Sequence, residues 1–290
     1  MRILLTGATG FVGSSILNHL IKDESLELET VSKRKPVNQS WQYATKHQIC
    51  DFESDCLQKL FHKRNYDLLV HAAWQGLPDR SPEINSRNAQ FSAKLFKEFV
   101  RAGGKAIVGL GSCLEYGESK GSVSENDLGT NVSNFGLVKR SLLKQLIGLG
   151  IPYLWVRPFY LYGISQHTDS LLKMALKYIS HDDFTWMREP FAANDFTSVE
   201  DLGRLIHEAI ERQLWLGELN VGTSILTQNI EFVNLVRKLK KEKEYEISQH
   251  EFQGISADLT KLKESFPEFS FKKLIDGLEV INREIDMARN

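Results

Sequence analysis

The chain has 290 residues, 42% of them hydrophobic and 25% charged, and a formal net charge of −1. This composition excludes a largely disordered chain, and the near-zero charge gives no general attraction to nucleic acid or to an anionic membrane. We find no signal peptide and no apolar stretch long enough to span a bilayer, so we expect a cytoplasmic protein with no nucleic-acid or membrane partner.

The opening residues, MRILLTGATGFVG, predict a nucleotide-binding turn. A short apolar strand over 3–6 leads into Gly7, Gly10 and Gly13, and a helix with apolar residues at helical spacing is predicted over 11–21. The first glycine permits the tight turn, the second lets a pyrophosphate approach the backbone, and the third lets the helix pack closely on the strand. The helix then points free N–H groups at the phosphates.

The end of the second predicted strand, residues 28–32, bears on the choice of dinucleotide. An acidic residue at this position accepts hydrogen bonds from the adenosine ribose 2′-OH and repels a 2′-phosphate. Here Ser32 is followed by the cations Lys33, Arg34 and Lys35. A hydroxyl with three cations favours the extra phosphate of NADP, although NAD is not excluded and an exposed basic loop is the alternative interpretation.

The next two strands deliver further candidates to the same sheet edge. A third strand over 48–50 leads to Asp51 and Phe52, which offer an acceptor and an apolar face for an adenine ring, or form a surface turn. A fourth strand over 68–71 leads to Ala72 and Ala73, whose small side chains leave room for a ligand across the sheet. His71 at its end is interpreted as structural.

The fifth strand is the last to reach this edge. A helix over 84–102 carries Asn88 in its early turns, and the strand over 106–110 is followed by GSCLEYG, which contains Ser112 and Tyr116. Any chemistry is expected at this point.

Alternating strands and amphipathic helices predict an α/β fold, a Rossmann-type doubly wound parallel sheet with a smaller C-terminal α/β substrate lobe. We assign 1–163 plus about 195–225 to the NAD(P)-binding domain, and about 164–194 plus 226–290 to the lobe. Cys50, Cys56 and Cys113 show no metal-ligand spacing, so reduced thiols and no metal site are expected.

With these motifs in place, the chain resembles the extended short-chain dehydrogenase/reductases, the NAD-dependent epimerase/dehydratase family that acts mostly on nucleotide sugars. The resemblance covers nearly the whole length and rests on an ordered series: TGATGFVG, HAA, GSCLEYG, RPFYLYG, DFTSVEDLGRLI and LNVGT. It implies a cofactor site made by Gly7, Thr9, Gly10, Phe11, Val12, Gly13, Ser32, Lys33, Arg34, Asp51, Phe52, Ala72, Ala73, Asn88, Lys139 and Pro158.

The resemblance also implies a catalytic serine and a tyrosine–lysine pair spaced Y-x-x-x-K. Ser112 and Lys139 fall in the matching positions, but the tyrosine position holds Phe135. Phenylalanine has no hydroxyl, so it can neither donate nor accept the proton that carbinol oxidation or ketone reduction requires. The helix predicted over 135–149 carries this pair, which makes the second Y-x-x-x-K match, at Tyr116, a decoy.

Other departures lie on the substrate side. Tyr116 and Tyr160 are candidate replacement acids, and Asn194 stands where the family often carries an arginine that contacts substrate phosphates. Lys173, Lys177 or Arg188 could supply that charge or be surface residues. Trp186, Met187 and Phe191 could line a pocket or fill the core of the lobe.

Two functions follow from the resemblance. The first is an NAD(P)-dependent reductase or epimerase that acts on a 4-keto sugar nucleotide for surface polysaccharide synthesis. The second is a catalytically impaired cofactor-binding protein that acts as a regulator or sensor. The resemblance also implies a homodimer built on the helices at 84–102 and 135–149, where Phe91, Phe99, Leu142 and Leu146 either serve the interface or face the sheet. The sugar, the nucleotide and the stereochemistry are not specified.

Overall fold

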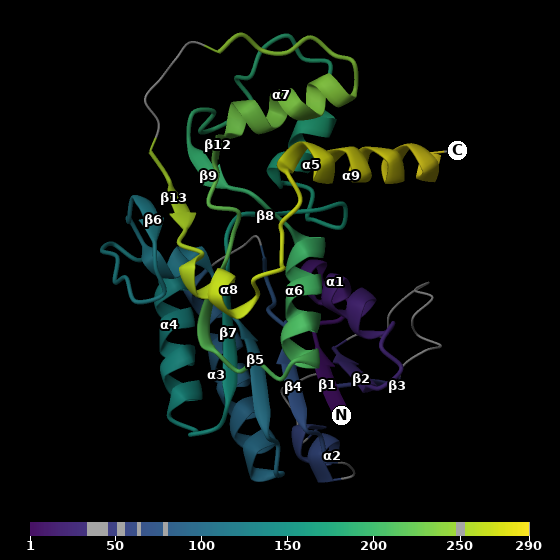
Figure 1. The fold of residues 1–290 in the computed structure, drawn as a ribbon, viewed down its shortest axis with the longest axis vertical. Coiled ribbons are helices and arrows are strands. Elements are labelled where there is room, and N and C mark those ends of the chain that lie inside the picture. The colour runs from purple at the N-terminus through teal and green to yellow at the C-terminus, as the bar shows by residue number, and fades with distance from the viewer. Residues whose placement is uncertain (34–45, 51–55, 63–64, 78–80, 248–252, 290) are drawn as a thin grey trace.

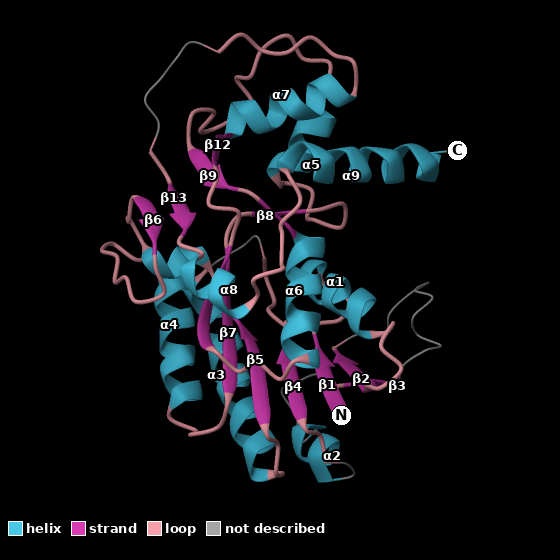
Figure 2. Ribbon diagram, in the orientation of Figure 1, coloured by secondary structure: helices cyan, strands magenta, loops and turns pink. Residues whose placement is uncertain are grey.

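A computed structural model describes residues 1–33, 46–50, 56–62, 65–77, 81–247 and 253–289. Its centre is a parallel seven-stranded sheet in the order β11-β7-β5-β4-β1-β2-β3 (Figure 2). The strands are β1 Arg2–Thr6, β2 Glu27–Ser32, β3 Lys46–Ile49, β4 Leu68–His71, β5 Ala106–Leu110, β7 Tyr153–Pro158 and β11 Gly217–Val221. The predicted Rossmann-type α/β class is confirmed. The strand order reverses between β1 and β4, which is where ligands bind in such sheets.

Helices cover both faces of the sheet, because successive strand residues point to opposite sides. Ile3 and Leu5 of β1 pack with α1 (Phe11–Leu20) and α6 (Val199–Glu211). Leu4 packs on the other face with α2 (Cys56–His62), α3 (Pro82–Arg101) and α4 (Asn134–Ile147). These two apolar layers hold the carboxyl ends of the strands in a fixed arrangement.

A third apolar cluster lies beyond the carboxyl edge of the sheet (Figure 1). It includes side chains from α5 (Leu171–Lys177), α7 (Asn229–Leu239) and α9 (Leu274–Arg289). The remaining elements are β6 Gly121–Val123, β8 Leu161–Tyr162, β9 Ala193–Asp195, β10 Thr197–Ser198, β12 Leu226–Gln228, β13 Ile255–Ala257, the 3₁₀ turn η2 Cys113–Tyr116 and α8 Thr260–Ser265. Small sheets pair β8 with β10, β9 with β12 and β6 with β13.

Element ends follow local chemistry. Helix α3 begins at Pro82, two residues before the predicted start, because Ser81 caps it by accepting a hydrogen bond from the Ile84 amide and proline suits the first turn. Helix α4 ends at Ile147, earlier than predicted, with Gly148 as its C-cap. None of the helices in the described ranges is both long and apolar enough to cross a membrane.

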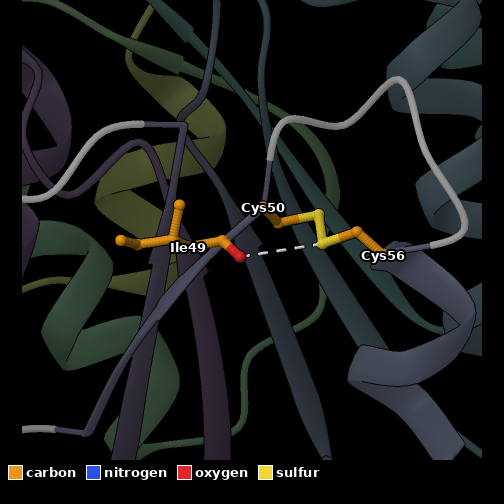
Figure 3. Close-up of a disulfide and its surroundings, with 3 residues drawn as sticks. All are labelled: Ile49, Cys50 and Cys56. Carbon is orange, nitrogen blue, oxygen red and sulfur yellow. Dashed lines mark hydrogen bonds between the residues drawn. A yellow bond between two sulfur atoms is a disulfide. The ribbon is translucent and has the colours of Figure 1, made fainter.

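The expectation of three reduced thiols is wrong for one pair. Cys50, directly after β3, is joined by a disulfide to Cys56, the first residue of α2 (Figure 3). Their Cα atoms lie 5.7 Å apart, a separation that a disulfide spans. Cys113 is a free, buried thiol. Residue spacing did not indicate the pair, because their proximity depends on where α2 begins relative to β3.

Candidate functional site

The turn between β1 and α1 has the shape predicted for a phosphate-binding turn. Gly7 has a φ of +74°, and a Cβ at this position would lie 2.6 Å from the Ala72 carbonyl carbon. A Cβ at Gly13 would overlap the carbonyl group of Gly7. Both positions therefore need glycine, because the turn passes directly against the end of β4 and α1 starts against the turn. The cradle fits a pyrophosphate that approaches the backbone.

A hollow of about 590 Å³, open to solvent, lies at the carboxyl edge of β1, β2 and β4. It brings together many of the residues predicted to bind the cofactor, and it adds Trp74, Gln75 and Phe91. Its lining is Gly7, Thr9, Gly10, Ser32, Lys33, Ala72, Ala73, Trp74, Gln75, Asn88 and Phe91. A concave site at the strand-order reversal is where a dinucleotide is expected.

Other predicted cofactor residues are not part of this lining or fall outside the described residues. The ring of Phe11 lies against Gly163, where an added Cβ would be 2.8 Å from it, and Val12 packs on the core. Pro158 ends β7 and pairs with Val221 of β11. Arg34, Asp51 and Phe52 fall outside the residues that the structure describes.

Asn88 and His71 fix the loop and strand beside the hollow. Asn88 on α3 accepts a hydrogen bond from the Gln75 amide (3.0 Å) and donates to the Gln75 carbonyl (2.9 Å). The His71 imidazole lies between the hydroxyls of Thr6 (2.7 Å) and Ser92 (2.8 Å). Burial lowers the pKa of His71 to about 3, so a neutral ring ties β1, β4 and α3 together. This is the structural role predicted for it.

Ser112 follows β5 and is held by a buried ion pair. Its backbone amide donates to Glu115 Oε1 (3.0 Å), and its hydroxyl oxygen accepts from the Leu114 amide (3.2 Å). Glu115 also accepts from Trp155 Nε1 (3.1 Å) and from Arg157 Nε (2.9 Å). Because the Glu115 and Arg157 side chains are only 1% and 9% exposed, this network sets the backbone position of Ser112.

Tyr116 lies in the same network and not at the hollow. Its hydroxyl donates to Asn220 Oδ1 (2.6 Å) and accepts from Arg157 (3.1 Å), and the residue is 1% exposed. Burial raises the pKa of the Tyr116 phenol to about 12. The hypothesis that Tyr116 replaces the missing acid is therefore corrected, because its proton is already committed to a buried partner.

Lys139, Phe135 and Trp74 form a compact group next to η2 and β5. The Lys139 ammonium donates to the Leu110 carbonyl (2.8 Å) and lies 3.7 Å from the centroid of the Trp74 ring. The Phe135 ring is edge-on to Trp74, with centroids 5.6 Å apart. Burial lowers the pKa of Lys139 to about 7. The amine can therefore hold or release a proton near neutral pH.

Tyr160, the other candidate acid, is at the surface. It follows β7, is 38% exposed, and its ring centroid lies 6.3 Å from that of Phe196. The role of Tyr160 as a replacement acid stays a prediction.

The substrate-side residues divide into buried and exposed groups. Asn194 is 8% exposed and donates to Asn229 Oδ1 (2.9 Å), which joins β9 to the start of α7. Lys177 and Arg188 are exposed and Lys173 is half-buried. Met187 is part of the third apolar cluster, against which Trp186 and Phe191 pack. Of the two interpretations of these three residues, the structure shows them packed in this apolar cluster.

Comparison with known proteins agrees with this geometry. Residues 3–222 match the NAD dependent epimerase/dehydratase family. The chain belongs to that family. The matched residues include the glycine turn after β1, Ser112 after β5 and Lys139 on α4.

Individual relatives of the family are distant. The chain is 23% identical to an uncharacterized UDP-glucose epimerase, YtcB, of Bacillus subtilis, over 84% of this chain and 83% of the relative. It is 23% identical to GDP-6-deoxy-D-talose 4-dehydrogenase of Aggregatibacter actinomycetemcomitans, over 78% and 75%. A tyrosine-to-phenylalanine mutant of UDP-glucuronic acid 4-epimerase from Bacillus cereus, solved with UDP-4-deoxy-4-fluoro-glucuronic acid and NAD, superposes with a TM-score of 0.83. It is 20% identical, with 99% of this chain and 100% of that chain covered.

Four residues around the site had no individual role predicted from sequence: Trp74 and Gln75, which line the hollow, and Glu115 and Arg157, which hold Ser112. A signal for the first pair was available, because both directly follow Ala72 and Ala73 at the end of β4. The Glu115–Arg157 pair had no comparable signal, since Glu115 lies in η2 and Arg157 in β7, and the two meet only in the folded chain.

Proposed function

We propose that this chain is an NAD(P)-dependent nucleotide-sugar oxidoreductase or epimerase, with a 4-keto sugar nucleotide as its substrate class and surface polysaccharide synthesis as its setting. The observation that carries the proposal is the glycine cradle at the β1–β4 reversal, with Ser112 just after β5 and Lys139 on α4 reaching the end of that strand. The UDP- and GDP-sugar activities named for the relatives support the substrate class.

The residues of the hollow have distinct roles in this proposal. The turn at Gly7 and Gly10 and the N-terminus of α1 would hold the pyrophosphate, while Ser32 and Lys33 would hold the 2′-phosphate of NADP. A bound pyridine nucleotide would supply hydride exchange with the substrate carbon. Ser112 would donate a hydrogen bond to the reacting oxygen, because among the described residues its hydroxyl accepts from the Leu114 amide and its own hydrogen has no acceptor.

Proton transfer is the step for which this chain lacks the tyrosine that the family resemblance implies. Phe135 has no group to carry it, and Tyr116 is buried in another network. Lys139 is the remaining nearby group with a pKa near neutrality, about 7. General acid–base catalysis is worth about 10²–10⁴-fold, so turnover without an efficient acid is expected to be slow.

A second function is favoured by the arrangement around Lys139. The Trp74 ring lies against the Lys139 amine, and the Phe135 ring packs edge-on against Trp74. A chain that binds its ligands without turning them over would act as a regulator or sensor. The Bacillus cereus mutant named above binds NAD and a nucleotide sugar with phenylalanine in place of a tyrosine, which supports binding without that hydroxyl.

The two functions are distinguished by following NADPH absorbance at 340 nm with a panel of 4-keto sugar nucleotides. The oxidoreductase function predicts slow NADPH consumption by the unmodified chain and faster consumption by Phe135→Tyr, by about 10²-fold or more. Phe135→Leu is the matched control, since it changes the ring without adding a hydroxyl. Consumption by Phe135→Tyr alone would favour the regulator.

We also propose that the segments 164–194 and 226–290 bind the substrate and that the chain forms a homodimer through α3 and α4. The structure changes which residues could serve that interface. Phe99, Leu142 and Leu146 are buried with residues of the sheet, whereas Leu137 on α4 is 52% exposed. Leu137→Asp is expected to give a monomer by light scattering. An unmodified chain that is already monomeric would contradict the proposal.

A further inference from the structure

Trp74 lies between two parts of the site that the structure keeps apart. It lines the hollow, while the centroid of its ring lies 3.7 Å from the Lys139 ammonium. Ser112, Phe135 and Lys139 do not belong to the lining of the hollow, as far as that lining is described. The Lys139 residue is only 5% exposed. Trp74 is therefore a wall that the hollow and the Lys139 amine share.

The sheet order places this wall on the path of a ligand that crosses the sheet. Neighbouring strands run β5-β4-β1-β2, and the glycine cradle follows β1. A dinucleotide that lies across the strand-order reversal puts one mononucleotide half on each side of it. One half lies over β1 and β2, and the other has to pass the end of β4 to reach β5. Trp74 follows β4, and the Leu110 carbonyl holds the Lys139 amine at the end of β5 (2.8 Å), so the second half meets the Trp74 ring first.

The backbone beside Trp74 is fixed, but no hydrogen bond holds its ring. Asn88 accepts from the Gln75 amide (3.0 Å) and donates to the Gln75 carbonyl (2.9 Å), which pins the loop. The indole Nε1–H of Trp74 is buried and has no acceptor among the described residues. The ring is kept in place by the Lys139 cation and by its edge-on contact with Phe135. Turning the side chain therefore breaks no hydrogen bond, and it lets the buried N–H reach an acceptor, which a buried indole usually has.

We propose that Trp74 is a gate: its ring closes the hollow toward Lys139 and turns aside to admit the half of a dinucleotide that passes β4. The inference rests on the proposed dinucleotide site and adds to it a side-chain movement that controls access to Ser112 and Lys139. The closed contact is autoinhibitory, because a ligand that occupies the second half has to displace a cation–π pair. A partly desolvated pair of this kind corresponds to about tenfold in an equilibrium constant.

Acetylation of Lys139 tests the gate without any ligand. A short pulse of acetic anhydride, followed by peptide mass spectrometry, reports how accessible each amine is. Trp74→Ala is expected to raise the labelling of Lys139 about tenfold relative to Lys144, an exposed lysine of the same helix. Trp74→Phe keeps a ring over the amine and is expected to stay close to the unmodified chain. Gln75→Ala is the matched control: it removes the neighbouring side chain of the hollow, leaves the backbone hydrogen bonds to Asn88 in place, and should leave Lys139 protected.

Calorimetry with two ligands tests what the gate excludes. NADP spans both halves of the proposed site, whereas adenosine 2′,5′-bisphosphate ends before the second half. Trp74→Ala is expected to bind NADP about tenfold more tightly than the unmodified chain does, and to bind the bisphosphate equally well. Trp74→Leu carries the same prediction and replaces the alanine variant if that chain does not fold.

The outcomes separate this inference from the proposed function. Unchanged labelling of Lys139 in Trp74→Ala, or an equal change in affinity for both ligands, refutes the gate and leaves the dinucleotide site standing. Weaker binding of NADP by Trp74→Ala also refutes the gate, because the ring is then a surface on which the ligand stacks. If the unmodified chain binds neither the bisphosphate nor NADP nor NAD, the dinucleotide site itself is refuted together with the gate.

Discussion

Replacing Lys139 by methionine is expected to change how the free energy of unfolding depends on pH. In the folded chain the pKa of Lys139 is lowered by burial from 10.5 to about 7. Between these values the unfolded chain binds a proton that the folded chain does not, so the stability contribution of Lys139 rises with pH. The whole interval corresponds to about 5 kcal/mol, and the slope within it approaches about 1.4 kcal/mol per pH unit.

Urea unfolding at pH 7.5 and pH 9.5 measures this effect. The free energy of unfolding of the unmodified chain minus that of Lys139→Met is expected to increase by about 2 to 3 kcal/mol between the two pH values. Lys144→Met removes an exposed lysine from the same helix and is the matched control. An unchanged difference for Lys139→Met would refute the lowered pKa of Lys139. It would also refute the proposal that this amine holds or releases a proton near neutral pH.

Three further substitutions test the surrounding structure. Gly13→Ala is expected to abolish dinucleotide binding in calorimetry, because its Cβ would overlap the Gly7 carbonyl; Gly148→Ala, with its closest atoms 3.5 Å away, is the control that should bind normally. Glu115→Gln is expected to lower the free energy of unfolding by about 3–5 kcal/mol in urea titrations, because it leaves a buried Arg157 charge unpaired. Tyr116→Phe should cost about 1–3 kcal/mol in the same assay and leave cofactor affinity unchanged; a large loss of affinity would return Tyr116 to the site.

Much of the fold could be predicted because buried parallel strands and glycine turns leave strong local patterns. Strands 68–71 and 106–110 were placed at their observed bounds, since each is a short apolar run followed by small residues. The turn at Gly7 was also evident, because positive φ and close backbone contact both require glycine.

The details of the site were less accessible, because they depend on contacts between distant segments. Tyr116 looked available from its position after β5, but its hydroxyl meets Asn220, which is 104 residues away along the chain. Trp74, in the loop after β4, gave no periodic signal, yet its ring lies against the ammonium of Lys139 on α4. The disulfide between Cys50 and Cys56 likewise depends on the spatial approach of a strand end and a helix start.

The central claim is that the turn at Gly7, Gly10 and Gly13 binds a pyridine dinucleotide. Isothermal titration of the protein, freed of any bound nucleotide, with NADPH, NADP, NADH and NAD tests it most directly. We expect saturable binding at one site per chain, tighter for the phosphorylated pair. The absence of binding heat with all four, confirmed by equilibrium dialysis, would contradict the account.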